Sequence, residues 1–230
     1  MRKLILTILL LMPFMVSATE IFTEDFESPV VTGTPPYFSS PTTYSGSPNP
    51  FTRWLRSDTG FGSGSAGVVI TNGNQQLTLR YTNSGYSTDE GEVGTIDIDS
   101  AIYTVSFDII PRVLLGNTGM NYKVEFVAYP DGYDRQNFST DPDLYEELAE
   151  VTGTTTTNRH ITIEYTTDAT TNAAASGMDL GIRVYGATSQ ASIDNITVDY
   201  VPYPRSVVRS GTSGLRVGTK LVAIVPPPEE

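Results

Sequence analysis

The sequence predicts an all-β protein, an antiparallel β-sandwich of the jelly-roll type with at most one short helix. Segments in which apolar and polar residues alternate recur along the chain, and this period of two is the signature of a half-buried strand. Turn-forming residues separate these segments, and the 13 tyrosines and 20 glycines favour strands and turns over helices. Long helices do not alternate with the strands in the pattern, which argues against α/β layers.

The N-terminus, residues 1–18, has the features of a secretory signal peptide. A basic start is followed by the apolar run Leu4–Val16 and by the small residues Ser17 and Ala18 of a cleavage site. The apolar run is shorter than the roughly 20 residues of a membrane-spanning helix. We therefore expect a secreted protein, extracellular or at the cell surface with the periplasm as the alternative, that has no transmembrane segment after cleavage.

Charge and cysteine content narrow the range of partners. Without Arg2 and Lys3 the chain has 12 basic and 26 acidic residues, a net charge of about −14. Such a surface repels phosphate backbones, so nucleic acid is not an expected partner, whereas scattered carboxylates can supply calcium sites. Cysteine is absent, so the domain has no disulfides or zinc–thiolate sites and must rely on its core.

The expected elements follow in chain order. Strands are predicted at Glu20–Ser28, Phe51–Arg56, Val68–Thr71, Gln75–Tyr81, Ala101–Ile110, Asn121–Tyr129, Asn158–Thr166, Asp179–Tyr185 and Ala191–Pro202. Pro29–Pro50 and Asn83–Gly94 are predicted to be loops. In Asp141–Val151 the apolar residues Leu144, Leu148 and Val151 have the spacing i, i+4, i+7, which predicts a short helix.

The closing strand contains one residue that departs from its pattern. Ile196, Val198 and Tyr200 share the apolar face, and Asp194 falls on the same face. A carboxylate turned toward a core must be paired, hydrogen-bonded or bound to a metal. A turn cap or a pair with Arg183 therefore stands beside a metal ligand as an interpretation. After this strand, residues 203–230 form a basic and then Pro/Glu-rich tail, expected to be partly disordered or an added hairpin.

The first and last strands carry a family resemblance. Asp25-Phe26-Glu27 and ASIDNITVDYVP resemble the galactose-binding-like β jelly rolls, the architecture of many carbohydrate-binding modules of bacterial polysaccharide-degrading enzymes. The resemblance implies one jelly-roll domain over 19–202. It also implies a structural calcium ion that ties the first strand to the last, with Glu27 and Asp194 as ligands.

The middle of the chain carries a second resemblance. LRYTNSGYSTDEGEVGTIDIDSAIYTVSFDI, ITIEYTTDAT and DLGIRVYGATSQASIDNITV look similar to secreted bacterial proteins of the kind that often carry a PEP-CTERM sorting tail. The apolar helix and basic stop of that tail are not seen here, so anchoring by that route is not expected.

Catalytic motifs are few. The sequence has a single histidine, His160, which excludes the H-E-x-x-H motif of zinc metalloproteases, and this histidine is expected to face solvent. The G-x-S-x-G motif of serine hydrolases does not occur. Carboxylate pairs such as Glu90 with Glu92 or Glu146 with Glu150 are unremarkable in so acidic a chain. A polysaccharide-active enzyme is therefore the weaker alternative.

Sugar binding uses residues that this sequence offers. Aromatic rings stack on the C–H faces of sugars, and polar side chains bind the hydroxyls. Trp54, Arg53, Tyr86 and Tyr133 are the predicted ligand-binding residues, with core packing as the alternative for Trp54. We expect a non-catalytic module that binds glycan or extracellular matrix polymer. The alternative is a structural or adhesive envelope protein with a protein partner.

Overall fold

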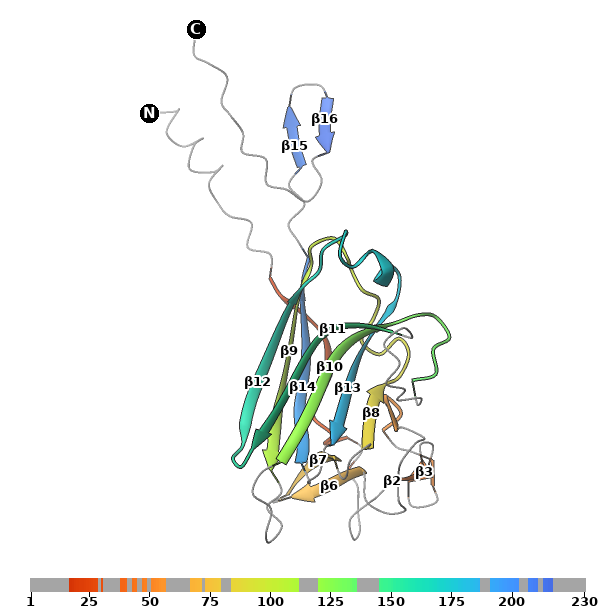
Figure 1. Cartoon of the computed structure of the whole chain (residues 1–230), viewed down its shortest axis with the longest axis vertical. Coiled ribbons are helices and arrows are strands. Elements are labelled where there is room, and N and C mark those ends of the chain that lie inside the picture. Colours follow the sequence, from red (N-terminus) through yellow and green to blue (C-terminus); the bar gives the residue numbers. More distant parts are fainter. Residues whose placement is uncertain are drawn as a thin grey trace, which may run out of the picture.

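Two antiparallel β-sheets packed face to face form the body of the computed structural model (Figure 1). The structure describes residues 17–28, 30, 38–40, 43–44, 47–48, 51–56, 67–71, 73–79, 84–111, 120–135, 145–186, 191–202, 207–210 and 213–216. The prediction of an all-β sandwich is confirmed. Nearly all of the expected signal peptide and most of the expected tail lie outside the described residues.

The six-stranded sheet is organised around β14. Its strands in order are β12 (Arg159–Thr166), β9 (Ile102–Pro111), β14 (Ala191–Val201), β7 (Asn74–Leu79) and β6 (Gly67–Thr71), with β1 (Thr19–Glu24) also paired to β14. One edge of β14 pairs with β9 along most of its length. The other edge is shared, because β7 pairs with its first residues and β1 with its last ones.

The five-stranded sheet covers the other side of the core. Its order is β11 (Glu146–Thr155), β10 (Met120–Tyr129), β13 (Asp179–Gly186), β8 (Ser84–Thr88) and β5 (Trp54–Arg56). Two smaller sheets contain β2 (Phe38–Ser40), β3 (Thr43–Tyr44) and β4 (Ser47–Pro48), and β15 (Val207–Ser210) and β16 (Ser213–Arg216).

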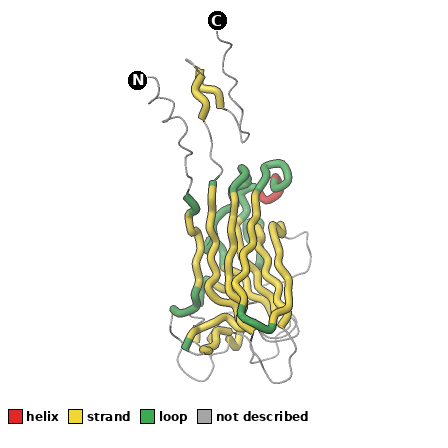
Figure 2. The backbone as a smooth tube through the Cα atoms, turned by 90° about the vertical axis from the view of Figure 1, so that its left-hand side faces the viewer, coloured by secondary structure: helices red, strands yellow, loops and turns green. Residues whose placement is uncertain are grey.

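Helix is almost absent from the described part of the chain. Its only helical segment is the 3₁₀ turn η2 (Ala173–Ala175), seen in red at one end of the body in Figure 2. None of the helices described is long and apolar enough to cross a membrane.

Strand alternation builds the core. In β9 the buried residues are Tyr103, Val105, Phe107 and Ile109, each separated by a partly exposed one. The facing strand β10 contributes Val124 and Phe126, and the rings of Tyr103 and Phe126 meet with centroids 5.5 Å apart. Burying one such side chain contributes about 1.5–3 kcal/mol.

Three local predictions are wrong. The first is the predicted loop Pro29–Pro50, which contains the short strands β2, β3 and β4. The predicted helix over Asp141–Val151 is replaced, from Glu146 onward, by strand β11, which pairs with β10. A register shift opposite Phe126 and Val127 leaves Leu148 without a partner, and this bulge gives the apolar residues a spacing that resembles a helix. Part of the predicted loop Asn83–Gly94 is strand β8, which lies between β13 and β5.

Candidate functional site

The outer face of the five-stranded sheet, the face turned away from the core, carries an unusual set of buried polar groups. On β10, Tyr122, Val124 and Phe126 point into the core, so the alternate residues point outward. Glu125 and Arg183, opposite each other in the β10–β13 register, are each only 1% exposed. Charged residues are rarely buried unless they are paired. This pair therefore indicates a specialised surface.

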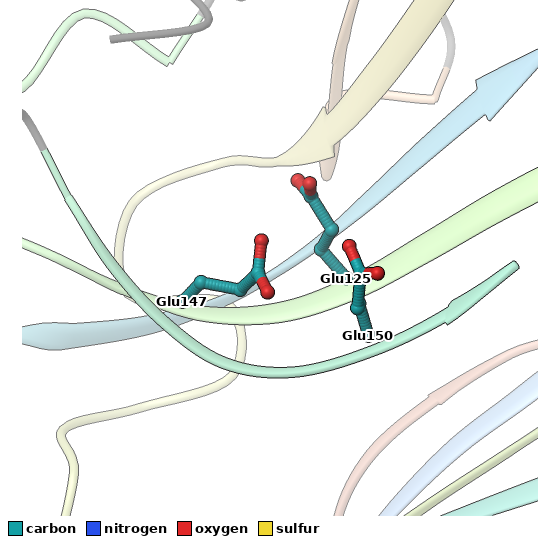
Figure 3. A group of neighbouring side chains, drawn as sticks. All are labelled: Glu125, Glu147 and Glu150. Carbon is teal, nitrogen blue, oxygen red and sulfur yellow. The ribbon is translucent and has the colours of Figure 1, made fainter. Parts of the chain in front are cut away.

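Lys123 gathers three carboxylates on this face. Its Nζ atom lies 2.5 Å from Glu125 Oε1, 2.9 Å from Glu150 Oε2 and 4.0 Å from Glu147 Oε2. Figure 3 shows the three glutamates, one from β10 and two from β11, with their carboxylates turned toward a common space. We call Lys123, Glu125, Glu147, Glu150 and Arg183 the Lys123 cluster.

The cluster has more negative charge than positive charge. Three carboxylates face the ammonium of Lys123 and the guanidinium of Arg183, whose Nε atom lies 3.5 Å from Glu125 Oε2. Burial, with the neighbouring carboxylates of Glu125 and Glu150, raises the pKa of Glu147. Partial burial of Lys123 acts to lower its pKa, but the hydrogen bonds to Glu125 and Glu150 outweigh that effect and raise the pKa.

Three tyrosines continue the outer face beyond Glu125. The ring of Tyr133 stacks on the buried ring of Tyr129 with centroids 5.0 Å apart, and Tyr145 lies 6.3 Å from Tyr133. The guanidinium of Arg183 lies 4.2 Å from the centre of the Tyr145 ring. Tyr133 and Tyr145 are half-buried, so a partly exposed aromatic shelf directly adjoins the Lys123 cluster.

Arg135 holds the shelf in place. Its Nη1 atom donates to the backbone oxygens of Thr88 and Asp89, and its Nη2 atom forms an ion pair with Asp179. The same guanidinium lies 4.4 Å from the centre of the Tyr129 ring. This buried arginine fastens the segment that carries Tyr133 to β8 and β13.

The predicted sugar-binding residues divide into two groups. Trp54 and Tyr86 are each 1% exposed and belong to the core, where Trp54 packs against Phe22 and Phe26. Neither ring has a face open to a ligand in this structure. Tyr133 is on the outer face.

Arg53 fastens neighbouring segments together. Its Nε atom donates to Glu92 Oε2 at 2.5 Å, and its Nη1 atom donates to the backbone oxygen of Thr23 at 2.7 Å. These contacts join the region before β5 to β1 and to the turn after β8. The side chain is 36% exposed, so it also reaches the surface.

The two predicted calcium ligands lie near each other at the junction of β1, β7 and β14. Just after β1 the backbone turns at Phe26, whose φ is +54°, and Gln75 of β7 donates its backbone N–H to Glu27 Oε1 at 2.8 Å. On β14, Asn195 has φ +50° within a bulge that places Asp194 opposite Asp108 of β9. We call Asp25, Glu27, Asp108 and Asp194 the carboxylate seam.

Asp194 is a buried acid among other acids. It is 4% exposed, and its Oδ1 atom accepts the backbone N–H of Asn195 at 2.9 Å. Burial raises its pKa to about 6, and the carboxylates of Glu27, Asp108 and Asp25 add to this effect. The alternative partner Arg183 lies instead in the other sheet beside Glu125. An oxygen-rich, acidic site of this kind fits the preferences of calcium.

Sequence reasoning missed the Lys123 cluster. The alternation of β10 already places Lys123 and Glu125 together on the face opposite Val124, which was the available signal. Glu147 and Glu150 were assigned to a helix, so their approach to Lys123 was not anticipated. Arg183 was considered only as a partner for Asp194.

Comparison with known proteins gives similarity of fold alone. No family model matches the sequence, and no curated protein sequence matches it. The CBM22-1 and GH10 modules of endo-1,4-β-D-xylanase 10B from Clostridium thermocellum, solved with xylohexaose, match 85% of this chain at 11% identity and TM-score 0.47. The chain spans only 30% of that structure.

Two further solved structures are similar over most of their own length. The CBM22-1 xylan-binding domain of Paenibacillus barcinonensis Xyn10C matches at 12% identity and TM-score 0.45, covering 80% of this chain and 96% of that one. A cleaved adhesin domain of Lys-gingipain from Porphyromonas gingivalis matches at 16% identity and TM-score 0.40, covering 78% and 99%. At such scores, function has to be argued from this chain's own residues.

Proposed function

We propose that this chain is a secreted, non-catalytic module that binds glycan through the outer face of its five-stranded sheet. The single observation that carries the proposal is the continuity of the aromatic shelf with the Lys123 cluster. Tyr133 and Tyr145 offer partly exposed rings for the apolar face of a sugar. The adjoining carboxylates and ammonium offer acceptors and donors for hydroxyl groups.

The same geometry argues against hydrolysis at this site. A glycosidase needs one carboxylic acid that donates a proton and a second carboxylate placed across the scissile bond. The three glutamates of the cluster instead converge on one lysine, and Glu125 is covered by Arg183. This arrangement supports recognition of a ligand and not proton transfer to it.

We also propose that the carboxylate seam holds a structural calcium ion. Glu27 and Asp194 would supply side-chain oxygens, and backbone carbonyls of the β1–β7–β14 junction would complete the shell. The support is the buried carboxylate of Asp194, which faces three other acids in a described region where no cationic side chain pairs with it. A bound ion would fasten the first strand to the last one and leave the glycan-binding face unchanged.

Retention on immobilised polysaccharides tests the glycan proposal. Tyr133→Ala and Tyr145→Ala are each expected to weaken binding by about two- to tenfold, since one aromatic contact is worth about 0.5–1.5 kcal/mol. Tyr165→Ala, a half-buried tyrosine of β12 in the other sheet, is the matched control. Melting curves of each variant verify folding. If folded Tyr133→Ala and Tyr145→Ala retain full affinity for every glycan that the wild type binds, the outer face is not the binding surface.

A further inference from the structure

The edge strands of the two large sheets differ in how well they are protected from pairing with another chain. An unpaired edge offers a row of backbone N–H and C=O groups to any strand that can lie beside it. Of the described edges, β5 has only three residues and β6 only five. β1 and β11 each carry a bulge, a feature that disturbs an edge and hinders pairing.

Strand β12 has neither kind of protection. It has eight residues and pairs with β9 without a register shift, and no other described strand pairs with it. Figure 1 shows it at the margin of the body. Its side chains alternate between exposed and half-buried, and Ile161 and Ile163 pack against the core while remaining partly open to solvent. Such a long, regular edge rich in β-branched residues is suited to pairing with a further strand.

The side chains of β12 are self-complementary about Thr162. When two β12 strands pair antiparallel with Thr162 opposite its own copy, Ile161 lies opposite Ile163 and His160 lies opposite Glu164. An imidazole attracts a carboxylate through a hydrogen bond or, when it is protonated, through an ion pair. Moving the centre by one residue either way places Thr162 opposite His160 or Glu164 and loses this contact. The sequence of the strand therefore favours one register.

His160 and Glu164 are both accessible for such a contact. The His160 Nδ1 atom lies 2.8 Å from Asp108 Oδ1, yet the side chain is 63% exposed. Asp108 is held in turn by Asn195, whose Nδ2 atom donates to Asp108 Oδ2 at 2.8 Å. Glu164 is exposed, and its cross-strand neighbour on β9 is the uncharged Thr104. The imidazole is thus oriented within its own chain while its ring stays open to a neighbour.

We propose that two copies of this chain associate through β12, with the strands antiparallel about a twofold axis at Thr162, so that the two six-stranded sheets become one continuous sheet. An axis normal to the sheet makes the interface self-complementary and leaves both core faces on the same side. Both five-stranded sheets, and their outer faces, then point in one direction. The use of this arrangement for bivalent glycan binding rests on the proposed function, whereas the association itself does not.

Sedimentation velocity from about 1 µM to about 1 mM measures the association. One strand edge buries less area than a standard interface, so we expect half-dissociation at about 10–100 µM. Glu164→Lys should weaken association about tenfold, because both imidazole–carboxylate contacts of the symmetric pair are lost. Adding His160→Glu to that variant restores opposite charges and should recover most of the affinity. Glu20→Lys makes the same change in net charge on β1, away from β12 in the same sheet, and should not weaken association.

Cysteine substitution maps the register, since the chain has no cysteine of its own. Opposite residues of antiparallel strands have Cα atoms about 4.5–5.5 Å apart, within the range that a disulfide spans. Thr162→Cys should therefore give a disulfide-linked dimer on mild oxidation. Glu164→Cys is the matched control, because its two copies lie about four residues apart along the strands, roughly 13 Å, and should not cross-link.

Melting curves verify that each variant folds. A wild type that sediments as a monomer at every concentration overturns the inference and leaves glycan binding by the outer face untouched. If Glu164→Lys associates as the wild type does, or if Glu20→Lys weakens association equally, the contact does not lie at β12. Equal cross-linking of the two cysteine variants would refute the register centred on Thr162.

Discussion

The substitution Asp194→Asn distinguishes a calcium-free carboxylate seam from a calcium-bound one, because its effect on the free energy of unfolding should change sign when calcium is added. In the apo protein, the pKa of Asp194 is raised from 3.8 to about 6. One pKa unit corresponds to about 1.36 kcal/mol, so keeping the ionised carboxylate in the fold costs about 3 kcal/mol. The native state binds the proton more tightly than the unfolded state. Stability therefore falls as the pH rises from about 4 to about 6, and the full penalty is present above pH 6.

The amide of Asn removes that charge and can still accept the backbone N–H of Asn195. With a chelator and above pH 6, the variant should be more stable than the wild type by up to about 3 kcal/mol. For a domain of this size that is a rise of about 6–12 °C in melting temperature. With calcium at about 1,000 times the Kd the order reverses, because the wild type gains about 4.1 kcal/mol and the variant lacks one ligand of the site.

Urea denaturation and melting curves at two pH values, each with chelator and with calcium, measure all four states. Asp199→Asn changes a half-buried aspartate of the same strand and is the control: its stability should match that of the wild type in chelator and should rise with calcium as the wild type does. If Asp194→Asn lowers stability in chelator, the carboxylate has a favourable partner and the reasoning about its burial is wrong. If calcium leaves the wild-type melting temperature unchanged, no structural calcium site exists.

Three further substitutions test the packing around the two sheets. Trp54→Ala should lower the free energy of unfolding by about 3–5 kcal/mol in urea titrations, because it empties a core site, while the folded fraction keeps its glycan affinity. A loss of glycan affinity without a loss of unfolding free energy would instead show that Trp54 belongs to the binding site. Gly181→Ala places a Cβ atom against the ring of Tyr129, so stability should fall by about 1–3 kcal/mol and glycan retention should weaken as the shelf shifts. An unchanged melting temperature and unchanged glycan retention would show that the Tyr129 ring moves aside without a cost in free energy. Arg183→Met leaves Glu125 buried with Lys123 as its remaining cation and should cost about 3 kcal/mol at neutral pH. An unchanged urea midpoint would contradict this value.

The sandwich could be predicted because its central strands follow simple alternation. Tyr103, Val105, Phe107 and Ile109 occupy every second position of β9, and the structure buries each of them. Asp194 was predicted only in part. It is buried, at 4% exposure, but the bulge at Asn195 shifts the phase of β14, so Ile193 takes the core position and Asp194 lies opposite Asp108, which points away from the core. The period of a regular strand can be read without knowing its neighbours, whereas a bulge changes its phase.

What could not be predicted depends on contacts between segments. The bulge at Leu148 adds a residue to β11, shifts the phase of its apolar positions and hides the strand. Tyr86 is surrounded by small polar residues in the sequence, which is typical of an exposed loop, but its ring is buried in the core. Its small neighbour Ser87 packs under Tyr129 of strand β10, with the two hydroxyl oxygens 2.8 Å apart. The Lys123 cluster joins residues of β10, β11 and β13, and only the register between strands brings them together.

The position of β14 in the sequence determines when the six-stranded sheet can form. This strand is the shared partner of β1, β7 and β9, and it is made after all of them. Until Val201 has been synthesised, the six-stranded sheet consists of a β6–β7 hairpin, a β9–β12 pair and an isolated β1. The growing chain therefore cannot close this sheet early. Because its pairings join distant parts of the sequence, we expect it to fold slowly and only once its last strand is available.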